Sequence, residues 1–252
     1  TSYISTLGWG SDNKDFDFWK EGAPVQYCGK DNLRQQSAMW QAMLMAAGLP
    51  NSKHIIINGF ITGADGQKMS KSIGNVISPF DVLDIYKEVT DYPEDVLRFV
   101  LLHDLSSFED GGMSLDTIKT SYQAYLQNGI GNLTNRIMKM AINAGVTLPV
   151  TESVTVVSKE IQNSLDNFDI KKAVEVVTLK INNLDKKIQE EEPFKVIKVD
   201  EIKGKAIIKE LLEILFSIGE DLQIFLPNTS AKILECIREN KMPEKPLFNR
   251  FV

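Results

Sequence analysis

The hydrophobic positions of this chain change their spacing along its length, and the change separates a mixed first third from a helical remainder. Two short apolar runs, PVQYC at 24–28 and HIIIN at 54–58, have the length and composition of strands. Between them, side chains from Leu33 to Leu44 recur every three or four positions, which predicts a helix over 32–47. Strand, helix and strand in this order predict a βαβ crossover with two parallel strands, the second of them buried.

After residue 76 the apolar positions follow the helical period almost throughout. Two short amphipathic helices are expected at 80–86 and 94–102, and a long one at 117–144. Further helices are expected at 154–166, 170–191, 202–219 and 229–240, with Asp169, Asn228 and Thr229 as candidate helix starts. Because the connections are short, neighbouring helices should pack antiparallel. The pattern therefore predicts an α/β unit followed by a mostly α-helical bundle.

The sequence KMSKS, which follows an Asp-Gly turn, is the clearest candidate for chemistry. Its residues are Lys68, Met69, Ser70, Lys71 and Ser72. Two ammonium groups on one short loop can stabilise the negative charge that develops on a leaving phosphate, and a loop can close over a bound nucleotide. A solvated, lysine-rich turn is the alternative interpretation.

Polar residues also follow the first predicted strand, in the turn Gly29-Lys30-Asp31. The carboxyl ends of parallel strands share one edge of a sheet, so this turn and the KMSKS loop should emerge on the same side. Asp31 could accept hydrogen bonds from ribose hydroxyls, with Gly29 allowing close approach of the ligand. Capping of the following helix is the alternative role for Asp31.

Composition narrows the class of protein without identifying a partner. The chain is 43% hydrophobic and 25% charged, as in ordinary globular proteins, and it has no apolar run long enough to span a membrane. Residues 1–120 carry 10 Lys and Arg against 16 Asp and Glu, whereas residues 121–252 carry 18 of each. Binding to nucleic acid would therefore depend on local patches. With two cysteines and two histidines far apart, we expect no zinc site and a cytoplasmic location.

The segments GKDNLRQQSAMWQAMLMAAGLP and GFITGADGQKMSKSIGNVISPFDVLDIY together resemble the second half of the catalytic domain of methionyl-tRNA synthetases, which are class I aminoacyl-tRNA synthetases. The resemblance implies that Lys68 and Lys71 are catalytic and that ATP, as its Mg²⁺ complex, contacts a larger set of residues. That ATP-binding set is Gly29, Asp31, Met69, Ser70 and Ser72. It further implies a methionine pocket lined by Tyr3, Asn32, Gln36 and Trp40.

Two features depart from the family pattern. Asn32 and Gln36 stand where the family usually has a large apolar residue and a histidine, both of which help to line the amino-acid pocket. The His-x-Gly-His signature of class I synthetases and the zinc-bearing insertion are also missing. We therefore expect the chain to be a carboxyl-terminal portion of such an enzyme, inactive alone.

The resemblance continues through the helical part of the chain. Asn132 and Arg136, in GNLTNR, match an asparagine and arginine pair that reads the anticodon in this family, and Phe194 after Glu-Pro replaces its stacking tryptophan. From spacing alone, Asn132 and Arg136 share a helix face with Asn128, Asn135 and Lys139, and this pattern by itself favours a solvated surface.

The resemblance thus implies three parts. These are a remnant of a Rossmann-type nucleotide-binding fold with the KMSKS loop at 1–75, a linking segment at 76–117, and a helical anticodon-binding domain at 118–252. The expected partners are tRNA(Met), methionine and ATP, and the expected reaction is ATP-dependent attachment of methionine to tRNA(Met). A helical RNA-binding module without catalysis, and a class I synthetase for another amino acid, remain alternatives.

Overall fold

A computed structural model describes residues 2–63, 66–67, 69, 76–149 and 157–251. The chain forms two compact units. The first comprises Thr1–Ile61 with Ser107–Gly111, and the second comprises Thr62–Ser106 with Gly112–Val252. The α/β character of the first and the helical character of the second agree with the fold class expected from the sequence.

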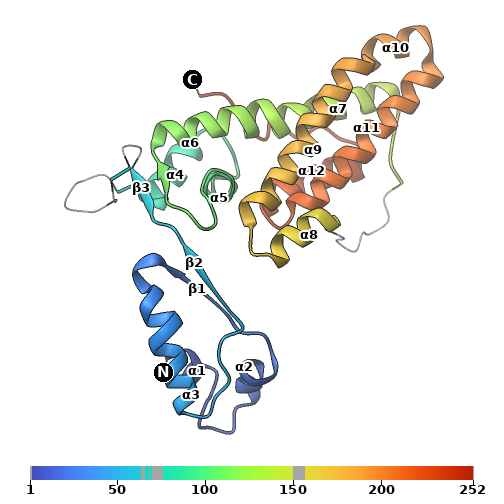
Figure 1. Ribbon diagram of the computed structural model, residues 1–252. Coiled ribbons are helices and arrows are strands. Elements are labelled where there is room, and N and C mark those ends of the chain that lie inside the picture. Colours follow the sequence, from blue (N-terminus) through green and yellow to red (C-terminus); the bar gives the residue numbers. More distant parts are fainter. Residues whose placement is uncertain (1, 64–65, 68, 70–75, 150–156, 252) are drawn as a thin grey trace. The chain divides into compact units, whose positions relative to one another are not determined.

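The first unit is built on a pair of parallel strands (Figure 1). Its elements are α1 (Ser2–Thr6), a 3₁₀ turn at Lys14–Phe16, α2 (Asp17–Glu21), β1 (Val25–Gly29), α3 (Trp40–Ala46) and β2 (His54–Asn58). Val25 lies opposite His54, and Gly29 lies opposite Asn58. This register confirms the predicted βαβ crossover. The side chains at 55–58 are only half-buried, because among the described strands β2 pairs with β1 alone, so the expectation of a buried strand was wrong.

The single helix expected at 32–47 is divided. A 3₁₀ turn at Lys30–Asn32 precedes a π-helical turn at Gln35–Met39, and only then does α3 begin. The Trp40 amide donates to the Gln35 carbonyl, five residues earlier, which is the backbone bond of the wider π-helical turn. Trp40 and Leu44 then join a small core completed by three aromatic and aliphatic side chains: Ile4, Phe16 and Trp19.

The second unit is dominated by helices (Figure 1). They are α4 (Pro79–Tyr86), α5 (Pro93–His103), α6 (Leu115–Ser121), a π-helical stretch at Tyr122–Gly131, α7 (Asn132–Ala144), α8 (Lys159–Asp166), α9 (Ile170–Glu191), α10 (Pro193–Val199), α11 (Glu201–Leu222) and α12 (Pro227–Glu239). The short strands β3 (Ile61–Gly63) and β4 (Gly111–Met113) pair with each other. Helix α11 packs against α7, α9, α10 and α12, so it forms the centre of the bundle.

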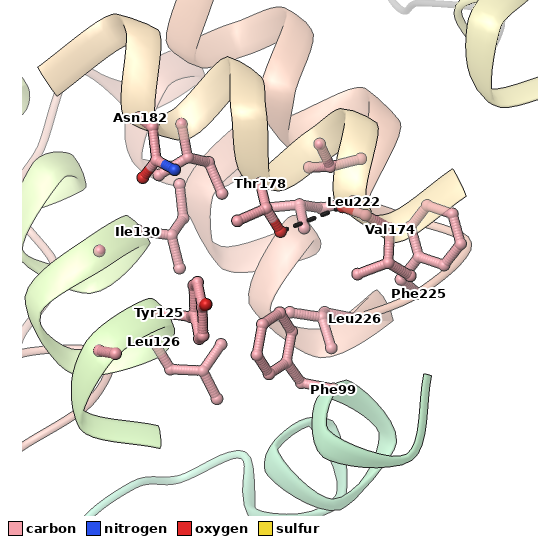
Figure 2. Close-up of a pocket in the computed structure, with 14 residues that line it drawn as sticks. Phe99, Tyr125, Leu126, Ile130, Val174, Thr178, Asn182, Leu222, Phe225 and Leu226 are labelled. Atoms are coloured by element: carbon pink, nitrogen blue, oxygen red, sulfur yellow. Dashed lines mark hydrogen bonds between the residues drawn. The ribbon is translucent and has the colours of Figure 1, made fainter. Parts of the chain in front are cut away.

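The long helix predicted at 117–144 is present but kinked. Gly129 has a non-helical ψ of −112°, and the turns around it are π-helical. An apolar cavity of about 20 Å³ lies beside this kink, between α5, α9 and the end of α11 (Figure 2). The Thr178 hydroxyl on its wall donates to the Val174 carbonyl at 3.1 Å. A space of this size holds about one water, so it is a packing defect of the core and not a substrate site.

Local signals explain several helix ends in this unit. Gly145 adopts a left-handed conformation with φ of 64° after α7, and the Asp169 side chain accepts from the Lys172 amide at the start of α9, as expected. The start of α12 differs from the expectation. Neither Asn228 nor Thr229 is its cap. Asp95 of α5 instead accepts from the Thr229 amide at 2.6 Å.

Candidate functional site

The turn after β1 presents a carboxylate to solvent. Asp31 is exposed, and the Asn32 amide contacts it loosely at 3.4 Å. A Cβ placed on Gly29 would lie 2.8 Å from the Asp31 Oδ1 atom, so the absence of a side chain at Gly29 leaves room for this carboxylate in its present position. Asp31 does not cap the helix that follows, because the structure gives that helix no side-chain capping bond. Its oxygens are therefore available to a ligand.

An ion pair and a hydrogen bond that the sequence did not predict hold the same turn in place. Asp110, about 80 residues later, pairs with the Lys30 ammonium at 2.8 Å and accepts from the Phe60 amide at 2.6 Å. The Lys30 ammonium, followed by the Phe60 amide, holds the pKa of the Asp110 carboxyl below its ordinary value. Gly59 makes the approach possible, since a Cβ there would lie 2.1 Å from the Glu109 carbonyl carbon. Asp110 thus joins the turn after β1 to the residues that lead toward KMSKS.

Three of the four residues expected to line an amino-acid pocket come together. The Tyr3 and Trp40 rings meet edge to face, with centroids 5.7 Å apart, and the Gln36 amide donates to the Tyr3 hydroxyl at 3.1 Å. The Trp40 Nε1 and the Gln36 Oε1 are buried and have no hydrogen-bond partner among the described residues. Buried polar atoms without a hydrogen-bond partner are few in folded proteins, and a ligand that hydrogen-bonds to them is one explanation for their presence. Asn32, the fourth, lies on the exposed turn beside Asp31.

The KMSKS residues Lys68, Ser70, Lys71 and Ser72 lie outside the described part of the chain. Met69 is described, and its half-buried side chain packs against the core of the second unit.

In the bundle, Asn132 and Arg136 occupy the first turns of α7. Asn132 is exposed, whereas Arg136 forms an ion pair with Asp185 on α9. The Gln189 amide donates to the second Asp185 oxygen at 2.6 Å. Asp185 therefore fixes the guanidinium of Arg136 while leaving roughly a third of the side chain open to solvent, at 36%.

Phe194 is positioned by a sharp change of direction. Glu192 takes a left-handed conformation with φ of 42°, which ends α9, and Pro193 then starts α10. Phe194 is 46% exposed, and the Lys195 ammonium lies 6.0 Å from the centroid of its ring. An open ring beside a cation is a surface on which an unpaired base can stack.

Among the described residues there is no cluster of three His, Cys, Asp or Glu side chains that could hold a metal ion. Within the same residues, the helices are all too short or too polar to cross a membrane.

Comparison with known proteins places this geometry in a family. A family model described as tRNA synthetases class I (M) matches residues 1–138. The methionine–tRNA ligase of Rickettsia prowazekii is 30% identical over 267 residues, covering 100% of this chain and 50% of that protein. The Fusobacterium nucleatum methionine–tRNA ligase is 29% identical over 248 residues, covering 92% of this chain and 38% of that protein.

The fold has a close structural counterpart as well. The Mycobacterium tuberculosis methionyl-tRNA synthetase in complex with methionyl-adenylate superimposes with a TM-score of 0.84 at 21% identity, covering 99% of this chain and 54% of that one. The chain thus spans half or less of the length of the sequence relatives named above. Since the family model matches more than half of its residues, the chain belongs to the class I tRNA synthetases of the M type.

Proposed function

We propose that this chain is the carboxyl-terminal portion of a methionine–tRNA ligase, which activates methionine with ATP and transfers it to tRNA(Met). The proposal rests on the contact between Tyr3, Gln36 and Trp40 in a chain of this family. Two buried polar atoms of these residues, Gln36 Oε1 and Trp40 Nε1, have no hydrogen-bond partner among the described residues. The relatives named above are methionine–tRNA ligases. In this proposal the chain works in the cytoplasm.

In the proposed reaction, methionine attacks the α-phosphate of ATP, bound as its Mg²⁺ complex, and pyrophosphate leaves. Lys68 and Lys71 stabilise the leaving pyrophosphate, supported by Met69, Ser70 and Ser72. Asp31 accepts hydrogen bonds from the ribose, while Gly29 allows the close approach. The terminal hydroxyl of the tRNA then takes the methionyl group from the methionyl-adenylate, and AMP leaves.

The methionine side chain in this proposal lies against Tyr3 and Trp40, with Asn32 and Gln36 at the polar end of the pocket. The Gln36 amide holds the Tyr3 hydroxyl at 3.1 Å, so it supplies the hydrogen bond that orients this ring. We assign residues 1–75 to catalysis, 76–117 to the link, and 118–252 to recognition of the anticodon.

Anticodon recognition is proposed for Asn132, Arg136 and Phe194. The Asn132 amide and the fixed guanidinium of Arg136 can hydrogen-bond to base edges, and Phe194 can stack on a base. The exposure of these groups also fits an RNA-binding module without catalysis, which is the second candidate function.

The test is binding of the purified chain to methionine tRNA and to the same tRNA with an altered anticodon, at several salt concentrations. We expect preference for the natural anticodon, and a loss of about tenfold or more on Arg136→Ala. Arg238→Ala, which removes an exposed arginine from α12, is the matched control. Binding that ignores the anticodon would remove the three recognition residues from the proposal.

Catalysis separates the two candidates. The chain alone should show no ATP–pyrophosphate exchange, whereas a version extended to the length of its relatives should show it. In that version Lys71→Ala should lower exchange by about 10² or more, the usual scale for loss of a preorganised electrostatic group. An extended protein that binds tRNA but does not exchange pyrophosphate would favour the RNA-binding module.

A further inference from the structure

Residues 107–111 belong to the first unit, although the chain on either side of them belongs to the second. Their backbone is bonded to the residues at the end of β2. The Asn58 side-chain amide donates to the Ser107 carbonyl at 2.8 Å. The Gly111 amide donates to the Phe60 carbonyl at 3.0 Å. The sequence assigned this stretch to the link between the catalytic and helical parts, so its attachment beside β2 is known only from the fold.

Asp110, within this stretch, joins the ends of both parallel strands through a single oxygen atom. Its Oδ1 accepts from the Lys30 ammonium at 2.8 Å and from the Phe60 amide at 2.6 Å. Lys30 is the first residue after β1, and Phe60 is the second after β2. In parallel sheets, ligands bind beyond these carboxyl ends of the strands. Asp110 therefore lies at the edge where a nucleotide is expected.

Close backbone packing sets the position of Asp110. A Cβ on Gly59 would lie 2.1 Å from the Glu109 carbonyl carbon and 2.4 Å from the Asp110 nitrogen. These are backbone atoms, which cannot rotate away as a side chain can. Because Gly59 permits this approach, the Asp110 backbone packs directly beside the end of β2, and its carboxylate extends from a fixed point.

The ion pair between Lys30 and Asp110 is too exposed to add much stability. Their side chains are 41% and 47% exposed, and exposed pairs contribute little because water screens them. Lys20 and Asp17 form a pair of similar exposure, at 51% and 47%, within the single helix α2. The Lys30 pair differs because it spans 80 residues and connects a turn to a separate segment. Its main effect should therefore be on the position of that turn.

The turn that contains Lys30 also carries Asp31, whose carboxylate is assigned above to the ribose. Lys30, Asp31 and Asn32 form one 3₁₀ turn without a side-chain cap. Because Asp31 directly follows Lys30, a shift of the Lys30 backbone displaces the Asp31 carboxylate. Misplacing a substrate-binding group by about 1 Å can lower a rate by about 10². A contact that fixes this turn can therefore affect function more than stability.

Building on the function proposed above, we propose that Asp110 is a positioning residue for the binding of ATP. By holding the Lys30 ammonium and the Phe60 amide on one oxygen, it fixes the turn after β1 where Asp31 can meet the ribose hydroxyls. Asp110 itself does not touch the nucleotide. A residue of the linking segment thus completes a site whose other members lie within residues 1–75.

The first test measures ATP–pyrophosphate exchange by the version extended to the length of its relatives. Asp110→Asn keeps the size of the side chain and an acceptor for the Phe60 amide, but it removes the charge that holds Lys30. It should raise KM for ATP by about tenfold and leave KM for methionine within about twofold, because only the turn after β1 moves. Asp17→Asn removes the comparable carboxylate from α2 and should change neither value.

Variants of Lys30 and Asp31 identify the path of the effect. Lys30→Met should raise KM for ATP as much as Asp110→Asn does, and the double variant should be no worse than either, since both changes break one contact. Lys30→Arg can donate to the same oxygen and should restore most of the affinity. In an Asp31→Ala background, Asp110→Asn should have no further effect. If Lys30→Met weakens ATP binding but Asp110→Asn does not, Lys30 contacts the nucleotide directly and the proposal is overturned.

The second test needs no reaction and uses the chain as it stands. Hydrogen exchange followed by mass spectrometry measures the order of residues 29–32 and 59–61. In Asp110→Asn these amides should exchange about threefold faster or more, while those of α3 stay unchanged. The melting temperatures of Asp110→Asn and Asp17→Asn should agree, since each variant loses one exposed ion pair. Equal exchange at 29–32 in parent and variant would overturn the proposal.

The outcomes separate this proposal from the one on which it rests. If the extended parent exchanges pyrophosphate and Asp110→Asn has an unchanged KM for ATP, the positioning role is overturned and the proposed function stands. A rise of both KM values with a lower melting temperature would also overturn it, because Asp110 would then only support the fold.

If the extended parent does not exchange pyrophosphate, the ligase function fails, and equilibrium dialysis with ATP decides the positioning role. Weaker binding of ATP by Asp110→Asn than by Asp17→Asn would uphold that role, and equal binding would overturn it.

Discussion

Asp95 lies in the first turn of α5, and its side chain is fully buried against the start of α12. One carboxylate oxygen accepts from both the amide and the hydroxyl of Thr229, at 2.6 and 2.7 Å. Burial raises the pKa of Asp95, although the Thr229 hydrogen bonds and the nearby Arg98 oppose the shift. Asp95 therefore ties two helices together at the cost of burying a charge.

This geometry predicts a dependence of stability on pH. Because the folded-state pKa lies above the ordinary value of 3.8, the contribution of Asp95 is fully present below pH 3.8 and is lost as the pH rises through the raised pKa. Relative to Asp95→Asn, which cannot titrate, the parent chain should lose free energy of unfolding as the pH rises above 3.8. Urea unfolding of both proteins at several pH values measures this difference, and a constant difference would contradict the prediction.

The same residues show what sequence could and could not predict. Asp169 was predicted as a helix start because its partner lies three residues away, and the structure confirms it. Asp95 and Asp110 were not singled out, since their partners lie 134 and 50 residues away in Thr229 and Phe60. Tyr3, Gln36 and Trp40 were grouped only through the family resemblance.

At the scale of elements, close helix contacts depend on glycines whose role the sequence does not reveal. In α11, a Cβ on Gly204 would lie 2.4 Å from the Ile197 Cα of α10. A Cβ on Gly219 would instead meet the flexible end of Leu234, 2.9 Å away. The first contact involves backbone, which cannot move aside without separating the two helices.

Gly204→Ala should therefore destabilise the bundle even though alanine favours helices by about 1 kcal/mol over glycine. Overpacking against the Ile197 backbone should lower the free energy of unfolding by about 1–3 kcal/mol. Gly219→Ala is the matched control, and it should cost less because the Leu234 side chain can rotate. Guanidinium unfolding compares them, and equal stabilities of the two variants would refute the backbone clash.

Helix boundaries were predicted well where the spacing of apolar residues is regular, and poorly where that spacing changes. The helices at 170–191 and 80–86 agree with α9 and α4 to within a residue. The π-helical turns at Gln35–Met39 and Tyr122–Gly131 were read as plain helix, because one extra residue in a turn barely alters an apolar pattern. Helix α10 was missed, since its seven residues are too few to establish a period.

At the scale of the whole molecule, the two units have very different cores. Among the described residues, five buried hydrophobic side chains form the core of the first unit. The core of the second unit is one much larger cluster, whose members come from positions between Val82 and Phe248. Stability rises with the apolar area that a unit can bury. The first unit should therefore open at a lower free energy than the second.

Hydrogen exchange followed by mass spectrometry measures this order. Backbone amides in β1 and α3 should exchange faster than those in α9 and α11, by about tenfold for each 1.4 kcal/mol between the two opening free energies. Equal protection in these four elements would mean that the chain opens as one cooperative body.

The bonds that fasten residues 247–249 to Val89, Thr90 and Tyr122 have a consequence for biosynthesis. Phe248 packs on the Tyr122 ring, and Phe251 packs on both Tyr122 and Tyr86. Thr90 leaves the ribosome 157 residues before its partner Leu247. At about 5–20 residues per second, these early aromatic rings wait roughly 8–30 s for the segment that covers them. During that interval the nascent chain presents them to chaperones, and a pause in translation before residue 247 lengthens this exposure.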